Sequence, residues 1–359
     1  MFSGRMTRAG VGWLCPSRRG LLWLLAILLP AMIITATHGG TEGLRDSPIG
    51  RLAASAATGV MTPLETGLPE GVEHLQDLFR VTADDGRRLS IDGWTDSAHW
   101  DPTREKTFFI GMRLYKRFIS YDALQNRWQE LGWAGEAPPK LEKFGHVYGR
   151  TALDYRRGHY YWHVPGELYR YDIDRRQWSS HAVRRLAAEI AMEWHEALDR
   201  LVALDRGGKI YVLQDGQFEP YGQAGVDGYH SVGRYNRTRR EMLFAGGNNS
   251  PHSLTAIDEN GRIRQFDPAP FAISIKNVSL TYDPVGGNYL FFLREQRMLY
   301  EFDPDRGRWR LVREWKAEEW PFGEFGFYTP VVIDDLGVIL FQSETGNRIY
   351  RHTTTNSPS

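Results

Sequence analysis

The chain is almost devoid of cysteine: Cys15 is its single thiol in 359 residues. One thiol cannot close a disulfide within one chain, and this one precedes a long apolar run. A small domain stapled by disulfides is therefore excluded. A domain built from the rest of the chain has no thiol chemistry.

An excess of charge of one sign is also lacking. Lys plus Arg and Asp plus Glu both total 44, and the first 36 residues hold four arginines and no acid. The rest of the chain is therefore mildly acidic, which argues against a nucleic-acid partner. The eleven histidines include no HExxH motif and no close pair of ligands, so we predict neither a metal nor a cofactor.

Residues 1–36 predict export or membrane anchoring. Arginines precede an apolar run from Leu21 to Ala36, as in a signal peptide or a signal anchor. Sixteen apolar residues are long for the hydrophobic core of a signal peptide and slightly short for a spanning helix, so both alternatives stay open. We expect an extracytoplasmic location, which is periplasmic, cell-surface or secreted, with residues 21–36 in the membrane if uncleaved. Residues 37–75 are rich in Gly, Ala, Ser, Thr and Pro, which predicts a flexible linker.

A short hairpin pattern recurs along the rest of the chain. An aromatic residue and an aspartate are followed, six residues after the aspartate, by a tryptophan, with a polar turn between. The copies are Tyr121, Asp122 and Trp128; Tyr171, Asp172 and Trp178; and Phe302, Asp303 and Trp309. We expect each tryptophan to pack between stacked sheets.

The predicted turns recur at regular intervals between residues 76 and 352, in two independent sets of positions. Each set indicates six repeated units. The first set follows the third strand of each unit and recurs every 43 to 50 residues, at Asp122, Asp172, Asp215, Asp258, Asp303 and His352. The second set follows the first strand, at Asp101, Asp154, Asp199, Asn236, Asp283 and Asp334. Four short strands per unit and no helical period of that length predict an all-β fold, a six-bladed β-propeller of four-stranded antiparallel blades.

The last unit ends after its third strand, at His352. We therefore expect a strand from the N-terminal side to close the ring, with residues 78–81 (LFRV) as the candidate. Residues 184–196 have helical propensity, but the spacing of the units places them in a loop and the first strand of blade three. Residues 353–359 are expected to be a disordered tail.

These hairpins, together with residues 242–247 (MLFAGG), give the region from about residue 95 to 352 a resemblance to the kelch and galactose-oxidase-like superfamily. Residues 242–247 resemble the kelch diglycine that follows a hydrophobic strand. The resemblance implies the propeller fold and leaves function open. Galactose-oxidase chemistry needs a tyrosine cross-linked to cysteine, so the composition excludes that activity.

Ligands of propellers usually bind where the innermost strands begin, at one mouth of the central channel. Six residues before each marker of the second set, every unit carries a side chain able to form hydrogen bonds. These candidate ligand-binding residues are Thr95, Tyr148, Glu193, His230, Asn277 and Tyr328, to which we add the neighbouring His195.

Three functions follow from this pattern. The first is an exported or tethered propeller that binds a glycan or protein partner at the channel mouth. The second is a uronate lyase or sugar epimerase, in which Tyr148 or His146 would remove a proton beside a carboxylate neutralised by Arg150. The third is a non-catalytic structural module of a cell-surface assembly. Plain binding, or polar residues that only hydrate the channel, is favoured over catalysis, so the sequence does not decide whether the protein is an enzyme.

Overall fold

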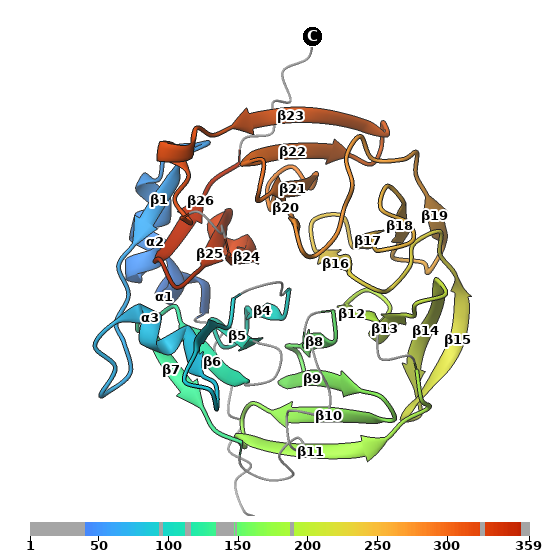
Figure 1. Ribbon diagram of the computed structural model, residues 1–359, viewed down its shortest axis with the longest axis horizontal. Coiled ribbons are helices and arrows are strands. Elements are labelled where there is room, and N and C mark those ends of the chain that lie inside the picture. The colour runs from blue at the N-terminus through green and yellow to red at the C-terminus, as the bar shows by residue number, and fades with distance from the viewer. Residues whose placement is uncertain are drawn as a thin grey trace, which may run out of the picture. The chain divides into compact units, whose positions relative to one another are not determined.

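Six four-stranded antiparallel sheets follow one another around a central channel (Figure 1). The computed structural model describes residues 40–92, 96–111, 116–133, 147, 149–186, 190–323 and 327–352. The sequence-based prediction of an all-β, six-bladed propeller is confirmed.

Each of the first five blades is built from four consecutive strands. Blade one comprises β4 (Ala98–Asp101), β5 (Lys106–Gly111), β6 (Arg117–Asp122) and β7 (Arg127–Leu131). Blade two comprises β8 (Thr151–Asp154), β9 (His159–Val164), β10 (Glu167–Asp172) and β11 (Gln177–Ala182). Blade three comprises β12 (Ala191–His195), β13 (Arg200–Leu204), β14 (Lys209–Gln214) and β15 (Gln217–Gln223). Blade four comprises β16 (Ser231–Asn236), β17 (Glu241–Gly246), β18 (Leu254–Ile257) and β19 (Ile263–Gln265). Blade five comprises β20 (Val278–Tyr282), β21 (Tyr289–Leu293), β22 (Met298–Asp303) and β23 (Arg308–Glu314).

Blade six joins strands from both sides of the chain. It comprises β24 (Thr329–Ile333), β25 (Val338–Gln342) and β26 (Asn347–Tyr350), with β1 (Met61–Leu64) paired antiparallel to β26. Residues 78–81, our candidate for this place, were the wrong choice. They lie at the end of α3 (Leu75–Leu78) and the start of β2 (Arg80–Thr82), which pairs with β3 (Arg88–Ser90).

The segment that we expected to be a flexible linker contains regular structure. It includes α1 (Gly40–Asp46), α2 (Pro48–Ser55) and β1. Leu44 and Ile49 are fully buried in the same apolar cluster as Leu64 and Val338 of blade six. The few apolar residues of this segment are thus part of the core, which its Gly- and Ala-rich composition concealed. The described residues also include the 3-10 helices η2 (Ala317–Glu319) and η3 (Asp334–Leu336).

The recurrent hairpins are the third and fourth strands of their blades. Tyr121 lies directly opposite Trp128, Tyr171 opposite Trp178, and Phe302 opposite Trp309. The ring centroids of these pairs are 5.4, 5.2 and 4.6 Å apart. Cross-strand aromatic contacts of this kind stabilise a hairpin and supply a large apolar surface to the neighbouring blade.

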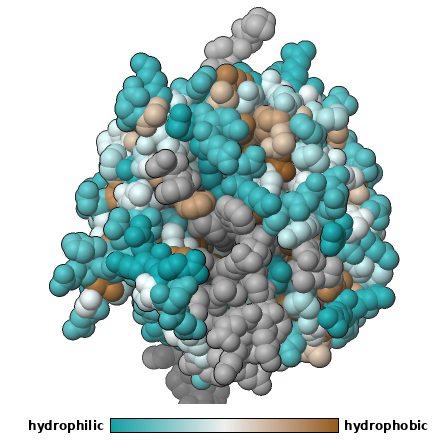
Figure 2. Space-filling model, viewed as in Figure 1, coloured by the Kyte–Doolittle hydropathy of each residue, from teal (hydrophilic) through white to brown (hydrophobic). Residues whose placement is uncertain are grey.

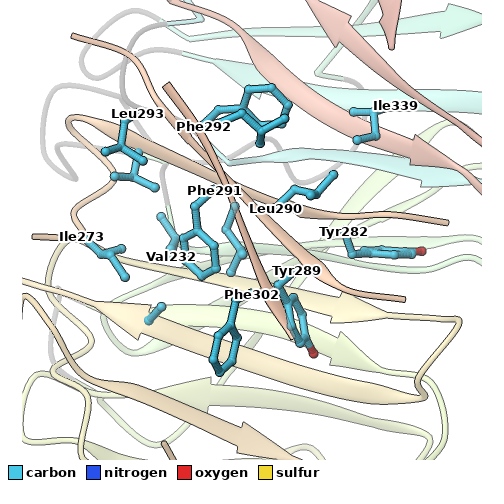
Figure 3. Packing of buried hydrophobic residues seen from close by; sticks show 14 of the residues in the cluster. Val232, Ile273, Tyr282, Tyr289, Leu290, Phe291, Phe292, Leu293, Phe302 and Ile339 are labelled. Carbon is cyan, nitrogen blue, oxygen red and sulfur yellow. The ribbon is translucent and has the colours of Figure 1, made fainter. Parts of the chain in front are cut away.

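Both faces of a blade are apolar because each blade is packed between two others. In β21 alternate side chains point to opposite faces, as the period of two requires (Figure 3). Phe292 contacts Phe341 of blade six at a centroid distance of 5.0 Å, whereas the Tyr289 hydroxyl donates to the Glu241 carbonyl of blade four at 3.3 Å. The core is therefore divided into layers between adjacent blades, and the six inner strands face the channel.

Candidate functional site

The channel is lined by the first strands of the blades, and its middle is polar. His99 of β4 lies with Nε2 3.0 Å from Thr151 Oγ1 of β8 and with Nδ1 3.6 Å from Glu193 Oε1 of β12. Arg234 of β16 approaches Glu193 Oε2 to 3.8 Å. These four side chains, from four successive blades, form what we call the channel cluster.

Burial controls the charges in the channel cluster. It raises the pKa of Glu193 to about 7, against the opposing effect of the Arg234 charge. Burial and the nearby Arg234 hold the pKa of His99 well below its usual range. His99 is therefore neutral at pH 7, and Glu193 exchanges its proton near that pH.

One end of the channel is occupied by an arginine, and we call it the Arg237 end. Arg237 directly follows β16, and its Nε donates to Glu196 Oε1 at 2.5 Å while Nη1 donates to Asp334 Oδ2 at 3.2 Å. Its guanidinium also lies 4.7 Å from the ring centre of Tyr155. The hydroxyl of Tyr282 donates to Asp334 Oδ1 at 2.7 Å. Residues that follow or end the inner strands of five blades thus meet here.

The cavity between the channel cluster and Arg237 is small. Its volume is about 50 Å³, and His99, Glu193, Arg234 and Arg237 are among its lining residues. A cavity must offer roughly 10–15 Å³ to hold one water, and sites for organic ligands measure roughly 300–1,000 Å³. This cavity therefore has room for a few waters and none for a sugar.

The opposite end of the channel, where the inner strands begin, we call the His230 end. His230, Asn277 and Tyr328 each directly precede an inner strand, in blades four, five and six. The structure thus brings three predicted ligand-binding residues to one end of the channel. Along an extended strand, seven residues separate His230 from Arg237, which corresponds to about 20 Å.

The three side chains at the His230 end have different environments. His230 is 6 % exposed, its ring stacks on Tyr229 at 4.0 Å, and its Nδ1 lies 2.8 Å from Asn248 Oδ1. Asn277 is half-buried and accepts a hydrogen bond from the Ser274 amide at 3.1 Å. Tyr328 is fully buried beneath Phe322, and burial raises its pKa above the usual range. Tyr328 and Asn277 thus form part of the wall at this end of the channel. His230 lies at the same end and stacks on the ring of Tyr229.

Two residues predicted for this end lie elsewhere. β12 ends at His195, which shows that Asp199 is not the equivalent of the other turn markers. Asp199 instead takes the left-handed position of the turn, with φ 53°. Glu193 therefore lies midway along the channel. His195 is fully buried between blades three and four, with Nε2 3.1 Å from the Ile257 carbonyl and Nδ1 accepting from the Leu198 amide.

The proposed catalytic group is described only in part. Thr95, His146 and Tyr148 lie outside the described residues. Arg150 directly precedes β8 and is 7 % exposed. Lys116 is equally buried, and burial together with the Arg150 charge lowers the pKa of its ammonium to about 8. The charge of Arg150 on blade two thus acts on Lys116 of blade one, whose ammonium also lies 5.4 Å from the centre of the Trp162 ring.

His99, Arg234 and Arg237 were not predicted from the sequence. All three are on inner strands or directly after them, at positions that face the channel. Two-residue alternation along each inner strand would have indicated His99 and Arg234. Arg237 follows Asn236, the residue that marks the turn. Beyond that point the alternation of a strand no longer predicts which way a side chain points.

Comparisons with known proteins find only distant structural similarity. No protein-family model matches the chain, and no curated protein has a similar sequence. Among solved structures, a streptogramin B lyase aligns over 81 % of this chain and 94 % of its own, with 11 % identity and a TM-score of 0.48. A fungal alcohol oxidase of the AA5 family, solved with copper, aligns over 74 % and 75 %, with 9 % identity and a TM-score of 0.46. An extracellular domain assigned to a one-component system of B. thetaiotaomicron aligns over 77 % of this chain and 34 % of its own, with 12 % identity and a TM-score of 0.47.

Two features are absent from the described residues. No helix among them is long and apolar enough to span a membrane. No three His, Cys, Asp or Glu side chains in the described ranges are grouped as a metal site would require. The apolar run of residues 21–36, predicted to be a signal peptide or anchor, lies outside those ranges, as does the tail of residues 353–359.

Proposed function

We propose that this chain is an exported or membrane-tethered binding propeller whose ligand, a glycan or a protein, occupies the His230 end of the channel. The observation that carries the proposal is the difference between the two ends. At one end Arg237 is held by Glu196 and Asp334, and the cavity behind it has room only for water. The other end gathers the polar residues that directly precede three successive inner strands.

The chemistry at the His230 end suits a polar ligand. The stacked Tyr229 and His230 rings offer an aromatic surface, and the half-buried amide of Asn277, which bonds to Ser274 and Ala272, adds a polar wall. Lys276, which precedes Asn277, is exposed there. The surface of the described residues in the view of Figure 2 is mainly hydrophilic, which fits a protein that works in water.

Binding is tested with the purified domain on a glycan array and in pull-downs from cell-envelope extracts. We use His230→Asn, because asparagine tolerates the left-handed backbone of His230 at φ 66°, and Lys276→Ala. The matched control is Arg308→Ala, an exposed arginine at the start of the outer strand β23. Binding that is lost in the first two variants and kept in the control supports the proposal. A ligand that binds all three variants equally, or the absence of any ligand for the wild type, contradicts it.

Export is tested separately, because it rests on the N-terminal sequence. Residues 1–40 fused to a reporter that is active only outside the cytoplasm should produce activity. Cell fractionation then distinguishes a cleaved signal peptide from a retained anchor. A cytoplasmic full-length chain would overturn the proposed location and leave the binding proposal intact.

The second candidate function, a uronate lyase or sugar epimerase, is favoured by one observation. Lys116 and Arg150 are buried close together, and two adjacent cations can neutralise a uronate carboxylate. The proton-abstracting role of Tyr148 or His146 remains a prediction. A lyase should release unsaturated products that absorb in the ultraviolet from uronate polymers, whereas an epimerase should invert a uronate centre without such products, and Tyr148→Phe with His146→Ala should abolish either activity. Neither an unsaturated product nor an inverted uronate from any uronate polymer would leave binding as the function.

A further inference from the structure

The cavity in the middle of the channel is limited to very small ligands. Its volume is about 50 Å³, and the charged side chains that line it are Glu193, Glu196, Arg234 and Arg237. Sites for organic ligands measure roughly 300–1,000 Å³, whereas one water needs roughly 10–15 Å³. A ligand of this cavity is therefore little larger than water, and a monatomic ion meets that limit.

Among the described residues that line the cavity, Arg234 is the cation without a close carboxylate. It is 8 % exposed, and its Nη1 lies 3.8 Å from Glu193 Oε2, which is longer than an N–H···O hydrogen bond. Its Nε has no acceptor in the part of the chain that the structure describes. Arg237, in contrast, donates to both Glu196 and Asp334. A buried guanidinium whose hydrogen bonding is incomplete favours a negatively charged ligand.

The charge of Glu193 decides whether Arg234 needs a further anion. Glu193 is 6 % exposed, and burial raises its pKa to about 7, so the carboxyl group is protonated below that pH. Above pH 7 its negative charge offsets that of Arg234. Below pH 7 the proton removes this charge, and an anion that enters beside Arg234 restores it. The total charge of the channel is then the same in both states.

The other titratable and charged groups near Glu193 keep their charges around neutral pH. Those that face it come from blades one, three, four and five and from the chain before β4: His99, Glu196, Arg234, Arg237, Tyr282 and Asp96. Burial and the Arg234 charge hold the pKa of His99 well below its usual range, and burial raises the pKa of Tyr282 well above its own, so both are neutral. Asp96 lines a second small cavity together with Arg234 and Arg294, so one carboxylate there faces two guanidinium groups. Glu193 is thus the group whose charge changes near pH 7.

We propose that the channel cavity binds one chloride ion beside Arg234, together with a proton on Glu193. The two are linked, so chloride favours protonation of Glu193 to the same extent as protonation favours chloride. The site is separate from the His230 end of the channel and does not depend on the function proposed for that end.

The test compares the melting temperature of the intact protein in sodium chloride and in sodium gluconate at equal ionic strength. Gluconate is an organic anion and too large for this cavity. At about pH 5.5, chloride in excess of its Kd should raise the melting temperature by about 3 °C relative to gluconate. At about pH 8.5 the difference should vanish. Line broadening in chloride NMR spectra measures binding directly and should show the same dependence on pH.

Glu193→Gln gives the sharpest prediction, because glutamine is neutral at every pH. Chloride should stabilise this variant equally at both pH values, a gain at high pH that a merely structural role of Glu193 would not produce. Arg234→Met should lose the chloride effect at both pH values. Arg308→Ala, which changes an exposed arginine of β23, is the matched control and should respond to chloride as the wild type does.

Equal melting temperatures of the wild type in chloride and gluconate at about pH 5.5 would overturn the proposal, and water would then be the occupant of the cavity. So would a chloride effect that persists in Arg234→Met, or one that disappears at high pH in Glu193→Gln. If Arg234→Met does not fold, the Glu193→Gln profile and the NMR linewidths of the wild type still decide the question. His230→Asn should leave the chloride effect unchanged, which separates this proposal from the one for the channel mouth.

Discussion

Arg237 Nε lies 2.5 Å from Glu196 Oε1, so an arginine that follows the inner strand of blade four pairs with a carboxylate that follows the inner strand of blade three. The same guanidinium reaches Asp334 of blade six across the channel. One side chain therefore joins blades that do not adjoin one another. A ring of sheets gains stability from such contacts because they oppose the separation of blades three, four and six.

We expect Arg237→Met to lower the free energy of unfolding by about 2 kcal/mol. Loss of the guanidinium leaves Glu196 and Asp334 partly buried without their cation, and breaking a fully buried pair costs roughly 3–5 kcal/mol. The side chain of Arg237 is 22 % exposed, so we expect a smaller cost. Urea denaturation measures it, with Arg240→Met as the control. Arg240 pairs with Glu259 at an exposed site, where the loss should be below about 1 kcal/mol. Equal losses in both variants would contradict the role of Arg237.

The stability of the protein should decrease as the pH rises through the range in which Glu193 ionises. Its pKa in the folded state is raised to about 7, whereas an unfolded glutamate titrates near 4.5. Between these values the folded chain binds the additional proton, so the free energy of unfolding falls with rising pH. Glu193→Gln removes this dependence. The variant should become more stable than the wild type by roughly 2–3 kcal/mol between pH 5 and pH 8. Parallel pH profiles of wild type and variant in urea denaturation would contradict the prediction.

Gly246→Ala should destabilise the protein more than Gly307→Ala. Both glycines have a positive φ, of 77° and 61°, so alanine pays a similar backbone cost of roughly 1–2 kcal/mol in each. A Cβ at Gly246 would lie 2.1 Å from the Ile273 carbonyl oxygen, whereas at Gly307 it would meet open space. We expect Gly246→Ala to cost at least about 2 kcal/mol more in thermal or urea unfolding. Similar losses would show that the loop of Ile273 moves away without cost.

Leu64→Ala tests whether β1 is an integral part of blade six. Leu64 is 6 % exposed and belongs to the apolar cluster that contains Leu44 and Val338. Removing its side chain should cost about 2–4 kcal/mol in urea denaturation, as in other cores. Leu124→Ala is the control, because Leu124 is 43 % exposed and should change stability by less than about 0.5 kcal/mol. No difference between the two variants would show that blade six is stable without β1.

Features encoded by neighbouring residues could be predicted from the sequence. The hairpins at Trp128, Trp178 and Trp309 combine turn residues with aromatic pairs less than ten residues apart, and all three form as expected. The pairing of β1 with β26 could not be predicted in this way. β1 is the four-residue strand MTPL, which contains a proline and has no clear alternation, and its partner is distant in the sequence. Residues 78–81 are more apolar than β1, and for that reason we predicted the wrong segment as the strand that closes the ring.

Only some residues of the candidate site could be predicted, because the prediction depends on turn residues that are clear in some blades and not in others. His230, Asn277 and Tyr328 were found because the turn after each inner strand is well marked in blades four, five and six. In blade three, the turn after the inner strand has His195 at the position where the other blades have Asp or Asn, and its Nδ1 accepts a hydrogen bond from the Leu198 amide. We had predicted Asp199 as the residue that marks this turn. That shift of four residues moved Glu193 from the middle of the channel to its mouth.

The pairing of β1 with β26 also determines when blade six can form during synthesis of the chain. Thr66, just after β1, contacts Asn347 across 281 residues of sequence. At roughly 5–20 residues per second, a ribosome needs about 15–55 s to make the chain between them. During that interval β1, the first of the described strands to leave the ribosome, has no partner strand, and the first five blades can fold before β1 pairs with β26. The nascent chain is then an open arc with an unpaired edge, and a chaperone has the most time to act on it before β26 emerges.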